Sequence, residues 1–433
     1  MQLHENKTCV VFEQERLTYG EIMKHAIHAA GILHDVYGIV KGDRVAICSR
    51  NFPDYLVIFW AIHVLGAVPV LVNAWLPVEP LHDCLKRTKN KVIFVDPERA
   101  ERIKSIVPEF RAKSNTPFVV LQDHEGKGPW PGMEPWSSVL KNYSGDPEKV
   151  FVKDPQILPE DDGMIVFTSG STGLPKGVLL SQRSYLTAIG NALASRGRAA
   201  LRRGEDVPFP PPVEGPQPGL LLPTPLFHTT GTSLIIITAV GGMKMVLMRK
   251  WDVKEAIRCV SKTCFLINSS AVTLAYSKLK TLSPLEGGYS DFGNQRKLSF
   301  NSVPSTIVDL VEGGGEGFPL QSVMLGGAPV STSISQRAKA AFPGSVLAQA
   351  YGQTECNATA VAFTGEDFEA RPTACGRAMP VNDIIIMKDE VECATGQAGE
   401  IWIRGPNVMN EYWDDPVATS KVTLRPSGTT IVH

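Results

Sequence analysis

A short polar loop near the middle of the chain carries the residues best suited to chemistry. It runs from Phe167 to Val178 (FTSGSTGLPKGV) and follows the apolar stretch Met164–Phe167. Accessible backbone N–H groups and hydroxyl donors are what a polyphosphate requires of a protein loop. Lys176 adds a fixed positive charge, and Gly177 stands where a Walker loop carries the hydroxyl that binds Mg²⁺. We therefore predict a phosphate site that is not of the Walker type, formed with Thr168, Ser169, Gly170, Ser171, Thr172 and Gly173.

This loop resembles the phosphate-binding signature of the adenylate-forming superfamily. That superfamily includes acyl-CoA synthetases, aryl-CoA ligases, luciferases and the adenylation domains of peptide synthetases. Other motifs similar to those of the family follow in order along the chain, so that the resemblance covers about residues 10–422. These motifs are Pro225–His228 (PLFH), Gly326–Val330 (GGAPV), Tyr351–Glu355 (YGQTE) and Gly399–Gly405 (GEIWIRG).

The resemblance implies a role for each motif. His228 would form a wall or gate of the acid pocket, Thr354 would donate to the α-phosphate, and Glu355 would bind Mg²⁺, which needs only one or two carboxylates beside phosphates. With Lys176, these make up the implied catalytic set. The implied nucleotide contacts come from the polar loop, from the turn Gly327, Ala328 and Pro329 against adenine, and from Tyr351, Gly352 and Gln353.

The reaction implied by the resemblance has two steps. ATP activates a carboxylic acid, fatty or aromatic, to acyl-AMP, and CoA then takes the acyl group, with Mg²⁺ as the metal. Three other interpretations stay open. They are an adenylation domain of the peptide-synthetase type, a nucleotide-binding protein without activity, and a gene fragment.

The apolar pattern predicts an α/β protein. Strand-length apolar segments alternate with helical ones, which is typical of largely buried sheets. Together with the resemblance, this predicts a large multilayered domain of mixed sheets flanked by helices, with a small β subdomain. The expected strands are Arg44–Cys48, Val92–Val95, Met164–Phe167, Leu220–Leu222, Lys244–Met248, Val323–Leu325 and Val346–Gln349.

The apolar run Tyr55–Val72 is long enough to cross a membrane, but His63, Gly66 and Pro69 interrupt it. We interpret it as a buried helix, a turn and a buried strand, and we expect no membrane span. His25 and His28 could share a helix face but have no third ligand nearby, so a solvated helix is expected there.

The charge balance excludes a global attraction to nucleic acid. Lys and Arg number 43 and Asp and Glu 44, for a formal net charge of -1. The eight cysteines form no CxxC pair, which favours a reducing compartment. We expect a cytoplasmic protein that binds a small carboxylic acid and a nucleotide, with no targeting signal in this sequence. A peroxisomal location stays open for a longer form, and the oligomeric state is not indicated.

Three segments depart from the family's pattern or from regular secondary structure. In residues 423–433 the sequence replaces the family's ribose-binding aspartate and the start of its small C-terminal domain with an atypical tail. Residues 267–300 form an insert without clear period, after an expected strand at Lys262–Leu266. The Arg- and Pro-rich stretch Arg196–Gly219 is expected to be a solvated loop. We predict domain limits of 1–422 for the large domain, and impaired turnover.

Overall fold

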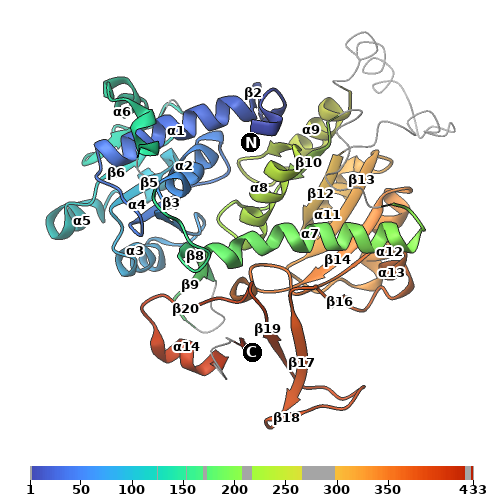
Figure 1. Ribbon diagram of the computed structural model, residues 1–433. Coiled ribbons are helices and arrows are strands. Elements are labelled where there is room, and N and C mark those ends of the chain that lie inside the picture. Colours follow the sequence, from blue (N-terminus) through green and yellow to red (C-terminus); the bar gives the residue numbers. More distant parts are fainter. Residues whose placement is uncertain are drawn as a thin grey trace.

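The computed structural model describes residues 2–123, 125–152, 154–168, 173–206, 217–265, 298–424 and 431–432. Within these ranges the chain folds into three sheets flanked by helices (Figure 1). Two are large and mixed, and the third is a small β unit, so the predicted α/β architecture is confirmed. Four predicted segments lie partly outside the described residues: Ser169–Thr172 of the polar loop, 207–216 of the Arg- and Pro-rich stretch, 267–297 of the insert, and 425–430 with 433 of the tail.

The first sheet has eight strands, of which β3, β4, β5 and β8 form its parallel and mostly apolar centre. β9 turns back antiparallel to β8, and this hairpin carries the polar loop at its tip. The strand order is β20 (Glu411–Tyr412), β9 (Lys176–Ser181), β8 (Asp162–Thr168), β4 (Val68–Leu71), β3 (Arg44–Cys48), β5 (Val92–Val95), β6 (Phe118–Val120) and β7 (Met133–Pro135).

The second sheet has nine strands, which are parallel from β14 to β1 in the order below and antiparallel at the two edges, where β15 and β16 follow β14 and β2 follows β1. Its order is β16 (Arg377–Ala378), β15 (Val361–Thr364), β14 (Val346–Tyr351), β13 (Leu320–Gly326), β12 (Leu298–Ser302), β10 (Gly219–Leu222), β11 (Lys244–Leu247), β1 (Thr8–Phe12) and β2 (Glu15–Thr18). The small third sheet has the order β18 (Val391–Glu392), β17 (Asp383–Lys388), β19 (Glu400–Arg404), β22 (Ile431–Val432) and β21 (Thr423–Leu424).

Helices α1 to α6 lie around the first sheet, and α7 runs from there along the second (Figure 1). The α-helices are α1 (Tyr19–Asp35), α2 (Pro53–Val64), α3 (Val78–Arg87), α4 (Pro97–Ile103), α5 (Val107–Ser114), α6 (Trp136–Asn142), α7 (Gln182–Arg202), α8 (Thr229–Gly241), α9 (Val253–Phe265), α11 (Pro304–Leu310), α12 (Thr332–Ala341), α13 (Glu366–Ala370) and α14 (Pro416–Val422). Shorter turns are η1 (Gln2–His4), η2 (Pro147–Phe151), η4 (Val311–Gly315) and η5 (Thr354–Cys356).

All seven strands expected from apolar runs are present, two of them with the predicted ends and the others within three residues. The run Tyr55–Val72 divides as expected into α2, a turn at Gly66 with a φ of 66°, and β4. No helix among the described residues is both long enough and apolar enough to span a membrane.

Three expectations were wrong. Residues 196–202 continue α7, because Arg, Ala and Leu favour helix and because this end is held by two contacts. Arg198 donates to the carbonyl of Ala378 at 3.1 Å, and Arg202 pairs with Asp367 at 2.8 Å. In place of the strand expected at Lys262–Leu266, helix α9 continues to Phe265.

The third correction concerns the predicted insert, whose last three residues begin the central strand β12. Leu298 and Phe300 are buried there, between β10 and β13. The tail also has regular structure where it is described, since β21 and β22 pair with each other and β22 pairs with β19.

A buried histidine is expected to make the fold less stable in acid. His63 of α2 stacks on Tyr185 of α7, with ring centroids 5.6 Å apart, and its Nε2 has no partner among the described residues. Burial lowers the pKa of His63 to about 4. As the pH falls below about 6.5, this histidine therefore binds a proton in the unfolded chain before it does so in the folded chain. The contribution of His63 to the free energy of unfolding is complete above that pH and declines toward pH 4.

We expect His63→Phe to flatten this decline, measured as the urea midpoint between pH 7 and pH 4. His25→Phe, on an exposed position of α1, is the matched control and should leave the slope unchanged. Equal slopes for wild type and His63→Phe would contradict this assignment.

Candidate active site

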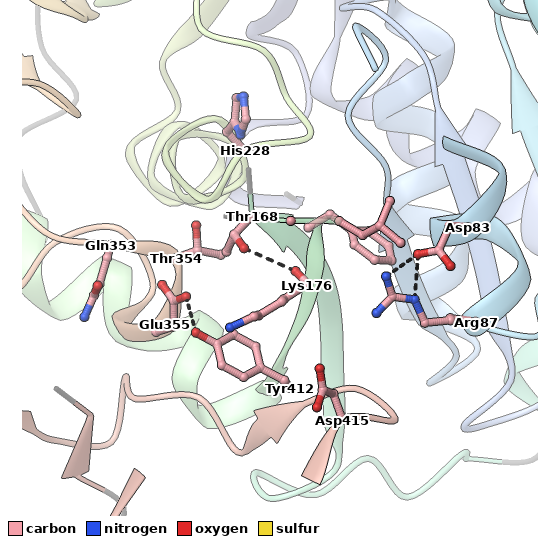
Figure 2. A pocket seen from close by; sticks show the side chains of 13 residues that line it. Asp83, Arg87, Thr168, Lys176, His228, Gln353, Thr354, Glu355, Tyr412 and Asp415 are labelled. Atoms are coloured by element: carbon pink, nitrogen blue, oxygen red, sulfur yellow. Dashed lines mark hydrogen bonds and ion pairs between the residues drawn. The ribbon is translucent and has the colours of Figure 1, made fainter. Parts of the chain in front are cut away.

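A cavity of about 870 Å³ opens at the tip of the β8–β9 hairpin (Figure 2). Segments far apart in the sequence line it: α3, the polar loop, the start of α8, η5 and the segment around β20. Of the residues predicted from the sequence, the cavity brings together Thr168, Gly173, Lys176, His228, Gln353, Thr354 and Glu355.

The two ends of the polar loop are held together by strand pairing. Thr168 lies opposite Lys176 in the β8–β9 ladder, and its hydroxyl donates to the Lys176 carbonyl at 3.5 Å. This register closes the loop at its base and directs the Lys176 side chain into the cavity (Figure 2). A fixed ammonium at that point can stabilise negative charge on a bound phosphate.

Glu355 lines the same cavity as Lys176 (Figure 2). It lies in η5, whose next residue, Cys356, is fully buried and anchors the turn. The Tyr412 hydroxyl donates to Glu355 Oε1 at 2.7 Å, and the Lys176 ammonium lies 4.8 Å from the centre of the Tyr412 ring. Asp415 also lines this cavity, but one of its carboxylate oxygens already caps α14 by accepting from the Ala418 N–H at 2.9 Å.

The donor set fits a magnesium ion that a nucleotide brings with it. No group of three or more His, Cys, Asp or Glu side chains that could hold a metal ion occurs among the described residues. Mg²⁺ is usually held by one or two carboxylates together with phosphates and water. Glu355 meets that requirement, because one of its carboxylate oxygens accepts from Tyr412 and the other can bind the ion.

His228 is placed by the turn that precedes α8. The side-chain oxygen of Asn51 accepts from the Leu226 N–H at 2.9 Å, and its amide donates to the Thr224 carbonyl at 3.1 Å. Asn51 follows β3, so the first sheet fixes this turn at the end of β10. Burial lowers the pKa of His228, which keeps the ring neutral near pH 7 and suits a pocket wall that meets an uncharged part of a ligand.

Gly231 makes this turn sterically possible. A Cβ at that position would lie 2.2 Å from the Pro225 carbonyl oxygen. We expect Gly231→Ala to displace the turn and to reduce the free energy of unfolding by about 1–3 kcal/mol. Gly190→Ala in α7, where a Cβ meets nothing within 4 Å, is the control and should be neutral or stabilising. Equal melting temperatures for the two variants would contradict the steric account.

The predicted adenine contacts lie beside the cavity and do not line it. Gly327 follows β13 with a φ of 73°, and Ala328 and Pro329 are exposed. Tyr351 ends the neighbouring strand β14, where burial raises its pKa. Gly352 is required by packing, because a Cβ there would lie 1.7 Å from the Ala358 carbonyl oxygen.

Five charged or aromatic residues that line the cavity were not predicted as site residues: Asp83, Arg87, Phe167, Tyr412 and Asp415. Arg87 of α3 pairs with Asp83 and donates to the Pro175 carbonyl at 3.1 Å, at the exit of the polar loop. Neither residue belongs to a motif, so no local signal could have found them. Tyr412 follows the motif Gly399–Gly405 along the chain, but its side chain could be placed in the site only from the fold.

Comparison with known proteins identifies the family. The profile of the family described as AMP-binding enzyme matches residues 1–413. The chain belongs to the AMP-binding enzyme family.

Members of the AMP-binding family resemble the chain along most of its length. It is 26% identical over 421 residues to 4-coumarate–CoA ligase 3 of Oryza sativa subsp. japonica, covering 95% of this chain and 66% of that protein. It is 25% identical to 4-coumarate–CoA ligase 1 of Solanum tuberosum, covering 93% and 65%. The chain thus spans slightly less than two thirds of the length of these relatives.

Solved structures of the family share the fold. o-Succinylbenzoate CoA synthetase from Bacillus subtilis, in complex with the acyl-adenylate intermediate OSB-AMP, superimposes with a TM-score of 0.72 at 18% identity, covering 99% of this chain and 72% of that one. The N-terminal domain of FACL13 from Mycobacterium tuberculosis gives a TM-score of 0.71 at 20% identity, covering 99% and 92%.

Proposed function

We propose that the chain is the large domain of an ATP-dependent acid–thiol ligase that activates a fatty or aromatic carboxylic acid and passes it to CoA. The observation that carries the proposal is the convergence of Lys176, Thr354 and Glu355 on one cavity beside His228. The 4-coumarate–CoA ligases among its relatives support the ligase class.

In the first step an oxygen of the acid attacks the α-phosphorus of ATP, and the bond to pyrophosphate breaks. Lys176 stabilises negative charge on the phosphates, and Thr354 donates a hydrogen bond to an α-phosphate oxygen. Glu355 would hold Mg²⁺, which would supply further positive charge to the phosphates. In the second step the CoA sulfur attacks the acyl carbon and the bond to AMP breaks, so the protein needs no covalent nucleophile.

The nucleotide would lie with its phosphates at the loop 168–173 and its base toward the ends of β13 and β14. There Tyr351 offers a ring for stacking, and Gly327 brings the backbone close to the base, with Ala328 and Pro329 beside it. Gly352 and Gln353 connect this part to Thr354. His228 would border the acid.

We propose 1–422 as the large domain, with the tail strand β22 joined to its small β sheet. Residues 1–433 tested alone should turn over slowly, because the resemblance implies that a small C-terminal domain takes part in the reaction. Nucleotide binding is the property that these residues should retain.

Lys176→Met tests the phosphate assignment. Loss of a charged partner should weaken ATP binding by about ten- to a hundredfold and leave adenosine binding unchanged. Calorimetry with both ligands checks this, with Lys388→Met on exposed β17 as the control. An equal loss for ATP and adenosine, or no loss, would remove Lys176 from the phosphate site.

A further inference from the structure

Tyr412 contacts both of the opposite charges on which the proposed function depends. Its hydroxyl donates to Glu355 Oε1 at 2.7 Å, while its ring lies under the Lys176 ammonium at 4.8 Å (Figure 2). Within the described chain, Lys176 and Glu355 form no ion pair with each other. The tyrosine is thus in contact with both charged side chains.

The backbone fixes Tyr412 to the carriers of both charges. β20 pairs with β9, with Tyr412 opposite Val178, and the Trp413 N–H donates to the Gly177 carbonyl at 2.7 Å, next to Lys176. On the other side the Met409 N–H donates to the carbonyl of Glu355 itself at 2.8 Å. The segment 409–413 therefore holds both charged residues in register with the tyrosine.

Burial of the Tyr412 ring restricts the movement of this side chain. Tyr412 is 6% exposed, and its N–H donates to the Thr419 hydroxyl at 3.0 Å. A buried ring with a bonded hydroxyl cannot swing away without breaking these contacts. A cation over an aromatic face is attracted to it and still keeps its N–H donors for another partner.

We propose that Tyr412 is a positioning residue that prevents Lys176 and Glu355 from neutralising each other before a nucleotide arrives. The inference rests on the proposed function for the roles of these two charges. The phenol takes one oxygen of Glu355 and leaves the other for a metal ion, and the ring holds the Lys176 ammonium toward the phosphates. Without the tyrosine, the two charges would close into an ion pair that a nucleotide must first break.

Two substitutions of Tyr412 test the contributions of its hydroxyl and of its ring separately. Tyr412→Phe should keep the affinity for ATP in EDTA within about threefold and weaken the affinity for MgATP by about tenfold, since Glu355 loses its hydrogen-bonded orientation. Tyr412→Leu should weaken ATP binding in both conditions, because Glu355 then captures Lys176. Calorimetry with ATP, with and without Mg²⁺, gives both values.

A double variant distinguishes this role from a merely structural one. Adding Glu355→Gln to Tyr412→Leu should restore most of the affinity for metal-free ATP, because the captured Lys176 is released. A general packing defect would not be repaired by changing Glu355. Failure of this rescue, or wild-type affinity in Tyr412→Leu, would overturn the proposal.

A measurement without nucleotide keeps the inference separate from the proposed function. Lys176→Met and Glu355→Gln are combined in a double-mutant cycle on urea unfolding, in the wild type and in Tyr412→Leu. The unfolding equilibrium constants should show no coupling between the two charges in the wild type and about two- to fivefold coupling in Tyr412→Leu. Equal coupling in the two backgrounds would refute the spacer role, whereas failure of wild type to bind ATP would refute the proposed function alone.

Discussion

Glu355→Gln should abolish the Mg²⁺ dependence of ATP binding while AMP binding stays within about threefold of wild type. The amide keeps the size of the side chain and can still accept from Tyr412, but it lacks the charge that a hard cation requires. We expect the affinity for MgATP to fall by about ten- to a hundredfold. AMP should be spared, because it lacks the β- and γ-phosphates through which the metal is shared.

Calorimetric titrations of ATP at increasing Mg²⁺ concentration measure this effect. Glu392→Gln, on the exposed strand β18, is the matched control and should behave as wild type. An unchanged Mg²⁺ titration in Glu355→Gln would remove this carboxylate from the ligands of the metal.

Phe300→Ala should reduce the free energy of unfolding by about 3–5 kcal/mol, the usual cost of truncating a buried phenylalanine. Phe300 is 0% exposed in β12 and contacts the ring of Trp251 at a centroid distance of 6.0 Å. Because β12 lies between β10 and β13, the cavity would form at the centre of the nine-stranded sheet.

Urea unfolding checks this value, with half-buried Ser302→Ala of the same strand as control. A loss below about 1 kcal/mol for Phe300→Ala would show that residues 298–300 are not part of the core. They would then belong to the insert, as the sequence alone suggested.

The strands were predictable because their signal is local. Arg44–Cys48 and Val92–Val95 are short, almost wholly apolar runs, and strands of a parallel sheet buried on both faces have that pattern. β12 was missed because the sequence LSFNS alternates and borders the long insert, so its burial depends on neighbours supplied by β10 and β13. The end of α7 was missed because its stabilising contacts, to Asp367 and Ala378, come from residues more than 160 positions away.

The residues of the candidate site likewise divide into those that local sequence predicts and those that only the fold places there. Lys176, Thr354, Glu355 and His228 lie in contiguous motifs, and the fold brings them to one cavity. Asp83 and Arg87 reach that cavity from a helix with no motif of its own.

The role of Tyr412 depends on geometry that spacing cannot give. Its strand pairs with β9 across more than 230 residues of sequence, and only this pairing places its hydroxyl on Glu355.

The central claim is that one site holds AMP and a carboxylic acid at the same time. Its most direct test is calorimetry of residues 1–433 with a stable sulfamoyl analogue of an aryl adenylate, compared with AMP and with the free aryl acid. A ligand that joins both halves should bind at least about a hundredfold more tightly than AMP, because the second half binds without a second loss of translational freedom. Binding of the analogue no tighter than that of AMP, across aryl and fatty acyl chains, would contradict the account.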